Sequence, residues 1–165
     1  QAVEIDGEPY WDGGYTGNPA LYPLIYQTSG LDILLVRLTP LQRTDNPTRS
    51  IDIIDRLSEI TFNASLISEM RAIAFVKRLI DEHKLDRGRY KPLHMHMVAD
   101  DAGMSAFNAS SKFNTDWAFL QELHRLGHQA ADGWLKAHRD RVGHDSSFDI
   151  HDAFLQQLGP APGHS

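Results

Sequence analysis

Residues 31–38 read LDILLVRL, a nearly continuous apolar run that a Thr-Pro pair ends. A strand covered by helices on both faces has this pattern, because apolar side chains are then needed at almost every position. The segment before it, residues 18–30, predicts a helix that Pro19 opens and a Ser-Gly pair ends. A helix followed by a doubly buried strand favours an α/β fold with a parallel sheet.

The rest of the chain adds elements compatible with such a sheet. Residues 3–11 predict a hairpin, since apolar and polar residues alternate around Asp6-Gly7, a pair that tight two-residue turns favour. Apolar residues recur at steps of three and four over residues 51–83, which predicts one long amphipathic helix or two in series. Residues 93–98, LHMHMV, predict a second strand of the sheet. The remaining expectations are a loop over 99–112 and helices over 116–141 and 148–158.

Composition excludes several classes of function. The 165 residues carry 16 basic and 22 acidic side chains, a net charge of −6, so the chain lacks the electrostatic footprint of nucleic-acid binding. No apolar run approaches the ~18 residues of a membrane-spanning helix, and residues 1–10 do not resemble a targeting signal. The absence of cysteine removes disulfides, thiolate zinc sites and cysteine nucleophiles. We expect a soluble globular protein that is cytoplasmic or peripherally bound to a membrane.

Residues 10–24, YWDGGYTGNPALYPL, resemble the acidic motif of the patatin-like phospholipase family. In that motif Asp-Gly-Gly or Asp-Gly-Ala closes a strand, and a short loop, an Asn-Pro pair and a helix follow. The resemblance implies that residues 1–165 are the C-terminal portion of a single patatin-like domain, a three-layer α/β hydrolase whose largely parallel central sheet is flanked by helices. Residues 1–40 would supply the Asp-motif hairpin, a helix and a strand. Residues 41–165 would be mainly helical with one further strand.

The family's chemistry, as the resemblance implies it, is acyl ester hydrolysis of lipids by a serine–aspartate dyad, with no histidine and no cofactor. At the matching positions Asp12 is the catalytic carboxylate, and Gly13 and Gly14 form the backbone turn of the active site. The family's Gly-x-Ser-x-Gly nucleophile elbow precedes this motif, and the chain lacks it. The nearest approach, residues 103–107 (GMSAF), has no second glycine and follows the aspartate. An N-terminal segment or a partner chain is therefore expected to carry the serine, and Gln1 is not expected to be a translation start.

A carboxylate needs a suitable environment to act in this way. A serine hydroxyl attacks an ester when a base within about 2.6–3.2 Å accepts its proton, and desolvation can raise a carboxyl pKa toward the working pH. Asp12 follows a predicted strand, and α/β sheets place their sites at the carboxyl ends of strands. Gly13 and Gly14 would let the backbone turn sharply and leave room for an acyl chain or the serine.

Nine histidines raise the alternative of a metal-binding protein. Two sets have plausible ligand spacing, namely His94 with His96 on one face of a strand, and His124, His128 and Asp132 at four-residue steps on a helix. A zinc helix of the His-Glu-x-x-His type would need glutamate where Arg125 stands. We favour surface or core histidines, and we expect no metal.

The remaining alternatives concern what the chain contacts. The substrate expected from the resemblance is a lipid ester, and a peripheral contact with a membrane is compatible with it. The basic side chains of residues 84–91 (KLDRGRYK) could touch anionic headgroups, although a solvated loop is the simpler interpretation. A non-catalytic binding or regulatory module on the same scaffold is the rival to the hydrolase.

Overall fold

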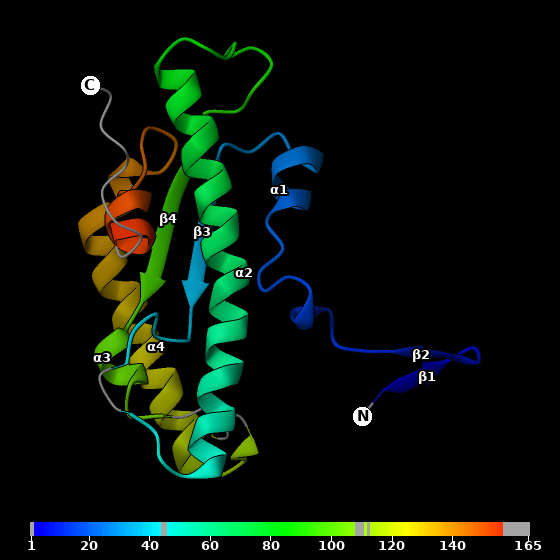
Figure 1. The fold of residues 1–165 in the computed structure, drawn as a ribbon. Helices are drawn as coiled ribbons and strands as arrows, with labels where there is room; N and C mark the ends of the chain where they lie inside the picture. Colours follow the sequence, from blue (N-terminus) through cyan, green and yellow to red (C-terminus); the bar gives the residue numbers. More distant parts are fainter. Residues whose placement is uncertain (1, 44–45, 108–110, 112, 157–165) are drawn as a thin grey trace.

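The computed structural model describes residues 2–43, 46–107, 111 and 113–156. Its centre is a parallel pair of strands, β3 (Asp32–Arg37) and β4 (His94–Ala99). The long helix α2 (Ser50–Asp81) connects the two strands and lies along one face of them (Figure 1). A strand, a helical crossover and a parallel strand make a βαβ unit, so the α/β class is confirmed. Of the larger sheet that the resemblance implies, the described residues contain this one parallel pair.

The hydrophobic core lies between this sheet and α2. The helix is continuous over 32 residues, and its three- and four-residue steps place one stripe against the strands. A π-helical turn, η4 (His151–Leu155), closes the same core with Phe154 and the preceding Ile150. The buried side chains at the centre of the core are Ile33, Leu35, Leu66, Met70, Ile73 and Met95.

The opposite face of the sheet is covered only in part. Helix α4 (Trp117–His138) packs on β4, where the His96 side chain is buried and meets the Trp134 ring edge-on, with the centroids 5.7 Å apart. On β3 the same face carries Leu34 and Val36, which are 52% and 63% exposed. The expectation that residues 31–38 are buried on both faces is wrong for this chain, because α4 covers β4 and leaves β3 uncovered.

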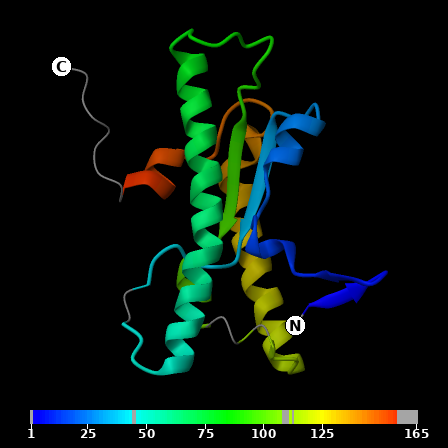
Figure 2. The same cartoon turned by 45° about the vertical axis from the view of Figure 1, so that its right-hand side comes forward.

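The N-terminal region forms a second, separate sheet. Strand β1 (Val3–Ile5) pairs antiparallel with β2 (Glu8–Tyr10), and between them Asp6 and Gly7 have φ of 51° and 83°. These left-handed values are those of the tight turn that an Asp-Gly pair favours, so the predicted hairpin is confirmed. All residues of both strands are exposed, and the hairpin extends away from the body of the molecule (Figures 1 and 2).

Several element boundaries differ from the expectations. Helix α1 (Tyr22–Gln27) begins three residues after Pro19, and Pro23 is the proline of its first turn. A short helix, α3 (Asp101–Met104), forms in the expected loop because the Asp100 carboxylate caps it by accepting from the Gly103 N–H. The expected helix over 116–141 is confirmed as α4 followed by the 3₁₀ turn η3 (Arg139–Arg141). The expected end of the last helix, 157–158, lies outside the described residues.

Spanning a bilayer as a helix requires about 20 consecutive, mostly apolar residues. Among the described residues, no helix is both long and apolar enough to cross a membrane.

Candidate functional site around Asp12

Asp12 lies two residues after the end of β2 and caps the 3₁₀ turn η1 (Gly13–Tyr15). Its Oδ1 accepts a hydrogen bond from the Gly14 N–H at 2.8 Å, and the Thr16 hydroxyl closes the same turn by donating to the Gly13 carbonyl at 2.9 Å. No other described residue donates a hydrogen bond to the carboxylate, which is exposed. The backbone therefore holds one carboxylate oxygen and leaves Oδ2 available to accept a proton.

Helix α2 anchors this turn from the side. The Tyr15 ring lies 6.1 Å from the Phe62 ring, centroid to centroid, and Trp11 meets Tyr15 edge-on at 6.4 Å. One turn further along α2, the Ser65 hydroxyl accepts from the Asn18 N–H at 3.2 Å. The aromatic ring contacts and this hydrogen bond attach residues 12–16, here called the Asp12 turn, to α2.

The two glycines of the motif have different roles. A Cβ at Gly14 would lie 3.1 Å from Asp12 Oδ1 and 3.3 Å from the Phe62 ring, so a side chain there would push the carboxylate or the ring aside. A Cβ at Gly13 would meet no heavy atom within 4 Å. Neither glycine has a positive φ, so the turn needs Gly14 for its close approach to Phe62 and does not need left-handed backbone at either position.

The setting of Asp12 differs from the one expected. It follows a strand of the exposed hairpin, not a strand of the parallel sheet, and α2 supplies the rigidity that the sheet was expected to supply. Figures 1 and 2 place η1 level with the carboxyl end of β3, on the side away from β4. Asp12 therefore lies near the edge of the sheet where α/β proteins place their sites, although it reaches this position from the side.

Beyond the Gly14 N–H, the described part of this chain supplies no serine or histidine partner for the carboxylate. Within it, no hydrogen bond or ion pair joins Asp12 to a serine or a histidine. The serine of residues 103–107, Ser105, follows α3 and donates its hydroxyl to the Ala102 carbonyl at 2.8 Å. An activated nucleophile is thus not assembled from these residues alone.

The structure brings His94 and His96 together around one carboxylate oxygen. Asp32 Oδ1 lies 2.9 Å from His96 Nε2 and 3.4 Å from His94 Nδ1, and it accepts from the Gly143 N–H at 2.8 Å. The Gly143 hydrogen bond first, and then the two histidines, hold the pKa of Asp32 below its ordinary value, against the opposing effect of burial. This cluster joins the amino ends of β3 and β4 to the turn after α4. We therefore assign the cluster a role in holding the fold together and not in binding a metal.

The second histidine set lies along α4. The His124 and His128 rings are 6.2 Å apart, centroid to centroid, and Lys136 Nζ donates to Asp132 Oδ2 at 2.7 Å, which lowers the pKa of Asp132. Across the ranges that the structure describes, no group of three or more His, Asp or Glu side chains is arranged to hold a metal ion.

The basic residues of 84–91 are mostly engaged within the fold. Lys91 Nζ donates to the carbonyl oxygens of Ile25 and Thr28 and so binds the end of α1. Lys84 pairs with Glu82 at 2.6 Å, and Arg87 lies 3.6 Å from the Asp81 carboxylate. This pattern agrees with the solvated-loop interpretation, since few of the charges remain for a headgroup.

Sequence reasoning missed the residues that position the Asp12 turn. Phe62 and Ser65 stand three apart on α2, so they share one face of the helix, but nothing in their spacing separates this face from an ordinary packing stripe. It also missed the ion pair of Arg43 with Glu59, 2.6 Å, which ties the loop after β3 to the first half of α2.

Comparison with known proteins supplies no relative. No protein-family model, no curated protein and no solved structure matches this chain significantly.

Proposed function

We propose that this chain is the aspartate-bearing portion of a patatin-like lipid acyl hydrolase, with Asp12 as the base of a serine–aspartate dyad. The observation that carries the proposal is the Asp12 turn itself. Its carboxylate has one oxygen bound by the Gly14 N–H at 2.8 Å and the other available, and the turn is packed on α2 through Tyr15 and Phe62. A general base needs this kind of fixed orientation with a lone pair left over.

The proposed reaction proceeds through an acyl-serine. Asp12 accepts the proton of the serine hydroxyl while the serine oxygen attacks the ester carbonyl. Asp12 then donates that proton to the leaving alcohol. Water then attacks the acyl-serine, Asp12 again accepting a proton, and the carboxylic acid is released with the serine restored. No cofactor takes part in either step.

The uncovered edge of β3 indicates where the serine would enter. Among the described residues β3 pairs with β4 alone, and its outward face carries the exposed Leu34 and Val36. A parallel strand added at this free edge would lie about 4.8 Å from β3 and end level with Asp12. A nucleophile elbow is a turn at the carboxyl end of a strand, so the proposed serine-bearing segment could supply both the missing strand and the nucleophile.

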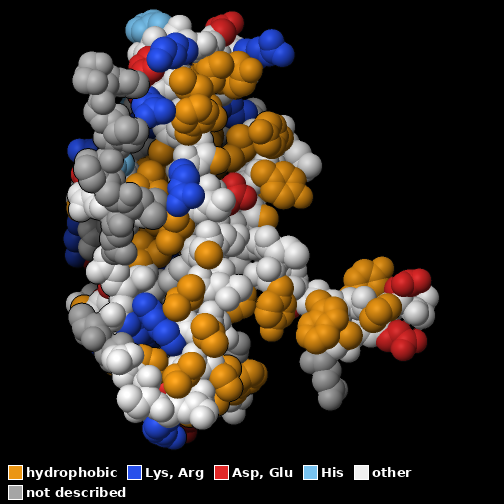
Figure 3. Space-filling model, in the orientation of Figure 1, with side chains coloured by type: hydrophobic (Ala, Val, Ile, Leu, Met, Phe, Trp, Pro, Cys, Tyr) orange, Lys and Arg blue, Asp and Glu red, His pale blue; other side chains and the backbone are white. Residues whose placement is uncertain are grey.

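Exposed aromatic side chains beside Asp12 fit a lipid substrate. Tyr10 and Trp11 precede the aspartate and are exposed, and Tyr22 and Tyr26 of α1 are exposed as well. Figure 3 shows hydrophobic side chains on the projecting hairpin and, separately, on the α1 region. Rings with a polar tip suit the boundary between water and lipid, which supports a peripheral contact with a lipid surface.

The test is Asp12→Asn in the complete enzyme, that is, this chain together with the serine-bearing segment. We expect this variant to lose hydrolysis of phospholipid and of a nitrophenyl ester while its thermal unfolding is unchanged. Asp6→Asn is the matched control, because Asp6 is an exposed carboxylate of the same hairpin at φ 51°, a conformation that asparagine tolerates. Near-normal turnover by Asp12→Asn would refute the role of Asp12.

A fluorophosphonate probe separates the hydrolase from its rival. A labelled serine on the segment or chain that accompanies this one supports the proposal. If the complete, folded sample shows no labelled band of any size, the hydrolase is rejected in favour of a non-catalytic binding module.

A further inference from the structure

A second candidate site lies on the other flank of α2 from Asp12. A cavity of about 910 Å³ opens between the C-terminal half of α2 and the segment from Arg141 to Leu155. Figures 1 and 2 place η4 and η1 on opposite sides of α2, so this cavity is separate from the Asp12 turn. Its apolar lining includes Ala74, Phe75, Phe148, Ile150 and Leu155.

The carboxylates at the cavity are all engaged with other groups. Asp81 lies 3.6 Å from Arg87, Glu82 lies 2.6 Å from Lys84, Asp145 accepts from the Ser146 N–H at 2.7 Å, and Asp149 accepts from the Asp152 N–H at 3.0 Å. These contacts reduce the repulsion that the carboxylates would otherwise exert on an anion that enters the cavity.

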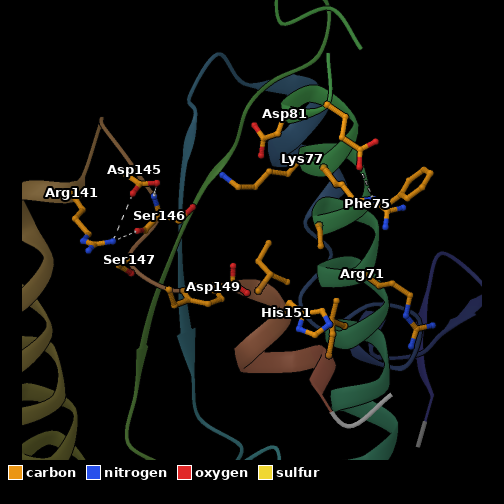
Figure 4. Close-up of a pocket in the computed structure, with 16 residues that line it drawn as sticks. Arg71, Phe75, Lys77, Asp81, Arg141, Asp145, Ser146, Ser147, Asp149 and His151 are labelled. Atoms are coloured by element: carbon orange, nitrogen blue, oxygen red, sulfur yellow. Dashed lines mark hydrogen bonds and ion pairs between the residues drawn. The ribbon is translucent and has the colours of Figure 1, made fainter. Parts of the chain in front are cut away.

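Lys77 is the one lining cation that points into the space without a partner of its own among the described residues. In Figure 4 its side chain extends from α2 toward the segment of Asp145 and Ser146, whereas Arg71 points away from the cavity. Arg141 donates to the Ser146 carbonyl at 2.9 Å, and Arg78 lies over the Phe75 ring. Lys77 is half-buried and forms no ion pair within 4.0 Å among the described residues, so its ammonium favours a ligand that supplies a negative charge.

We infer that this cavity binds a long-chain carboxylate, with the carboxylate on Lys77 Nζ and the alkyl chain against the apolar lining. A cavity of this size and mixed lining suits one small amphiphile, because ligand sites are mostly apolar with a few polar groups that fix orientation. The inference does not depend on Asp12 or on ester hydrolysis, so either proposal can fail while the other stands.

Displacement of a fluorescent fatty acid, 11-(dansylamino)undecanoic acid, tests the site on the full chain with its fold checked by circular dichroism. Dodecanoate should compete and acetate should not. Octanoate should compete more weakly than dodecanoate by well over tenfold, since each buried methylene changes affinity by about fourfold. The inference is overturned if the affinity does not depend on the length of the alkyl chain, or if the folded protein does not bind the fluorescent fatty acid.

The role of Lys77 is tested by removing the charge from the lysine and, separately, from the ligand. Lys77→Gln should weaken dodecanoate binding by about tenfold, as expected for a charge-assisted contact, and dodecanol should bind wild type and Lys77→Gln equally. Lys136→Gln is the matched control, because Lys136 is an exposed lysine already paired with Asp132 on α4. If Lys77→Gln binds dodecanoate as tightly as Lys136→Gln does, the assignment is wrong.

Discussion

Removal of the Asp32 carboxylate should destabilise the fold in a way that depends on pH. A single oxygen of this side chain accepts from the Gly143 N–H at 2.8 Å and from His96 Nε2 at 2.9 Å. His96 is 1% exposed, so the ring nitrogen that loses its partner in Asp32→Ala cannot turn to water. The substitution therefore leaves a buried polar atom without a hydrogen bond and cuts the link between the sheet and the turn after α4.

The expected loss in the free energy of unfolding follows from these two hydrogen bonds. A hydrogen bond to a charged group contributes about 1.5–3 kcal/mol, and the Asp32 side chain is 27% exposed, so solvent screens part of this. We expect Asp32→Ala to lower the free energy of unfolding by about 2–3 kcal/mol at pH 7, and Asp32→Asn, which keeps an acceptor oxygen, by about 1 kcal/mol. Asp81→Asn, which breaks only an exposed 3.6 Å pair, should cost no more than about 1 kcal/mol.

The stabilisation by Asp32 should decrease as the pH falls. Because folding lowers the pKa of Asp32, the folded state binds this proton less readily than the unfolded chain, and the stabilisation is complete above about pH 4. It is lost as the pH falls through the lowered folded-state pKa, so the difference between wild type and Asp32→Asn should shrink there. Urea unfolding followed by circular dichroism from pH 7 to pH 3 measures this difference. A cost for Asp32→Ala that matches Asp81→Asn, or a difference for Asp32→Asn that stays constant down to pH 3, would refute the reasoning.

Three further predictions concern the core, the Asp12 turn and the edge of the sheet. Met70→Ala should lower the free energy of unfolding by about 2–5 kcal/mol in a urea titration, because Met70 has no exposed surface and its removal leaves a cavity in the core. Phe62→Ala should reduce ester hydrolysis by the complete enzyme, since the Tyr15–Phe62 ring pair is worth about 0.5–1.5 kcal/mol, whereas the exposed Phe75→Ala on the same helix should leave turnover unchanged. Val36→Lys should change the stability of the isolated chain by no more than about 0.5 kcal/mol, yet prevent co-purification with the serine-bearing segment, which a pull-down measures.

The sequence predicts the central unit well because its signals are local. The apolar run at residues 31–38 and the alternation at residues 93–98 define the two strands, and the stepped apolar residues between them define the crossover helix. A strand, a helix and a strand in this order leave little freedom for the topology, since such units pair their strands in parallel.

The contacts that arrange the candidate site are not local, and no sequence pattern predicts them. Tyr15 packs on Phe62, and Asp32 accepts from Gly143, between residues far apart along the chain. Each contact depends on how helices pack on the sheet, which periodicity does not specify. The start of α1 shows a different difficulty, because Pro19 and Pro23 both suit a first turn and their local pattern does not separate the two positions.

The uncovered face of β3 carries two exposed apolar side chains, Leu34 and Val36, that the fold of this chain alone does not explain. Burying a valine or leucine side chain is worth about 1.5–3 kcal/mol, so Leu34 and Val36 on the exposed face represent stabilisation that this chain does not gain. Their apolar character is accounted for if another layer covers them, and the carboxyl end of β3 is level with η1, the turn that Asp12 caps (Figure 2). In our proposal, one strand added at the free edge would extend the sheet and complete the dyad, and the layer that packs on the extended sheet would cover Leu34 and Val36. The two roles can be separated, since Val36→Lys should abolish assembly and fluorophosphonate labelling of the complex together, whereas Asp12→Asn should leave assembly intact and abolish turnover.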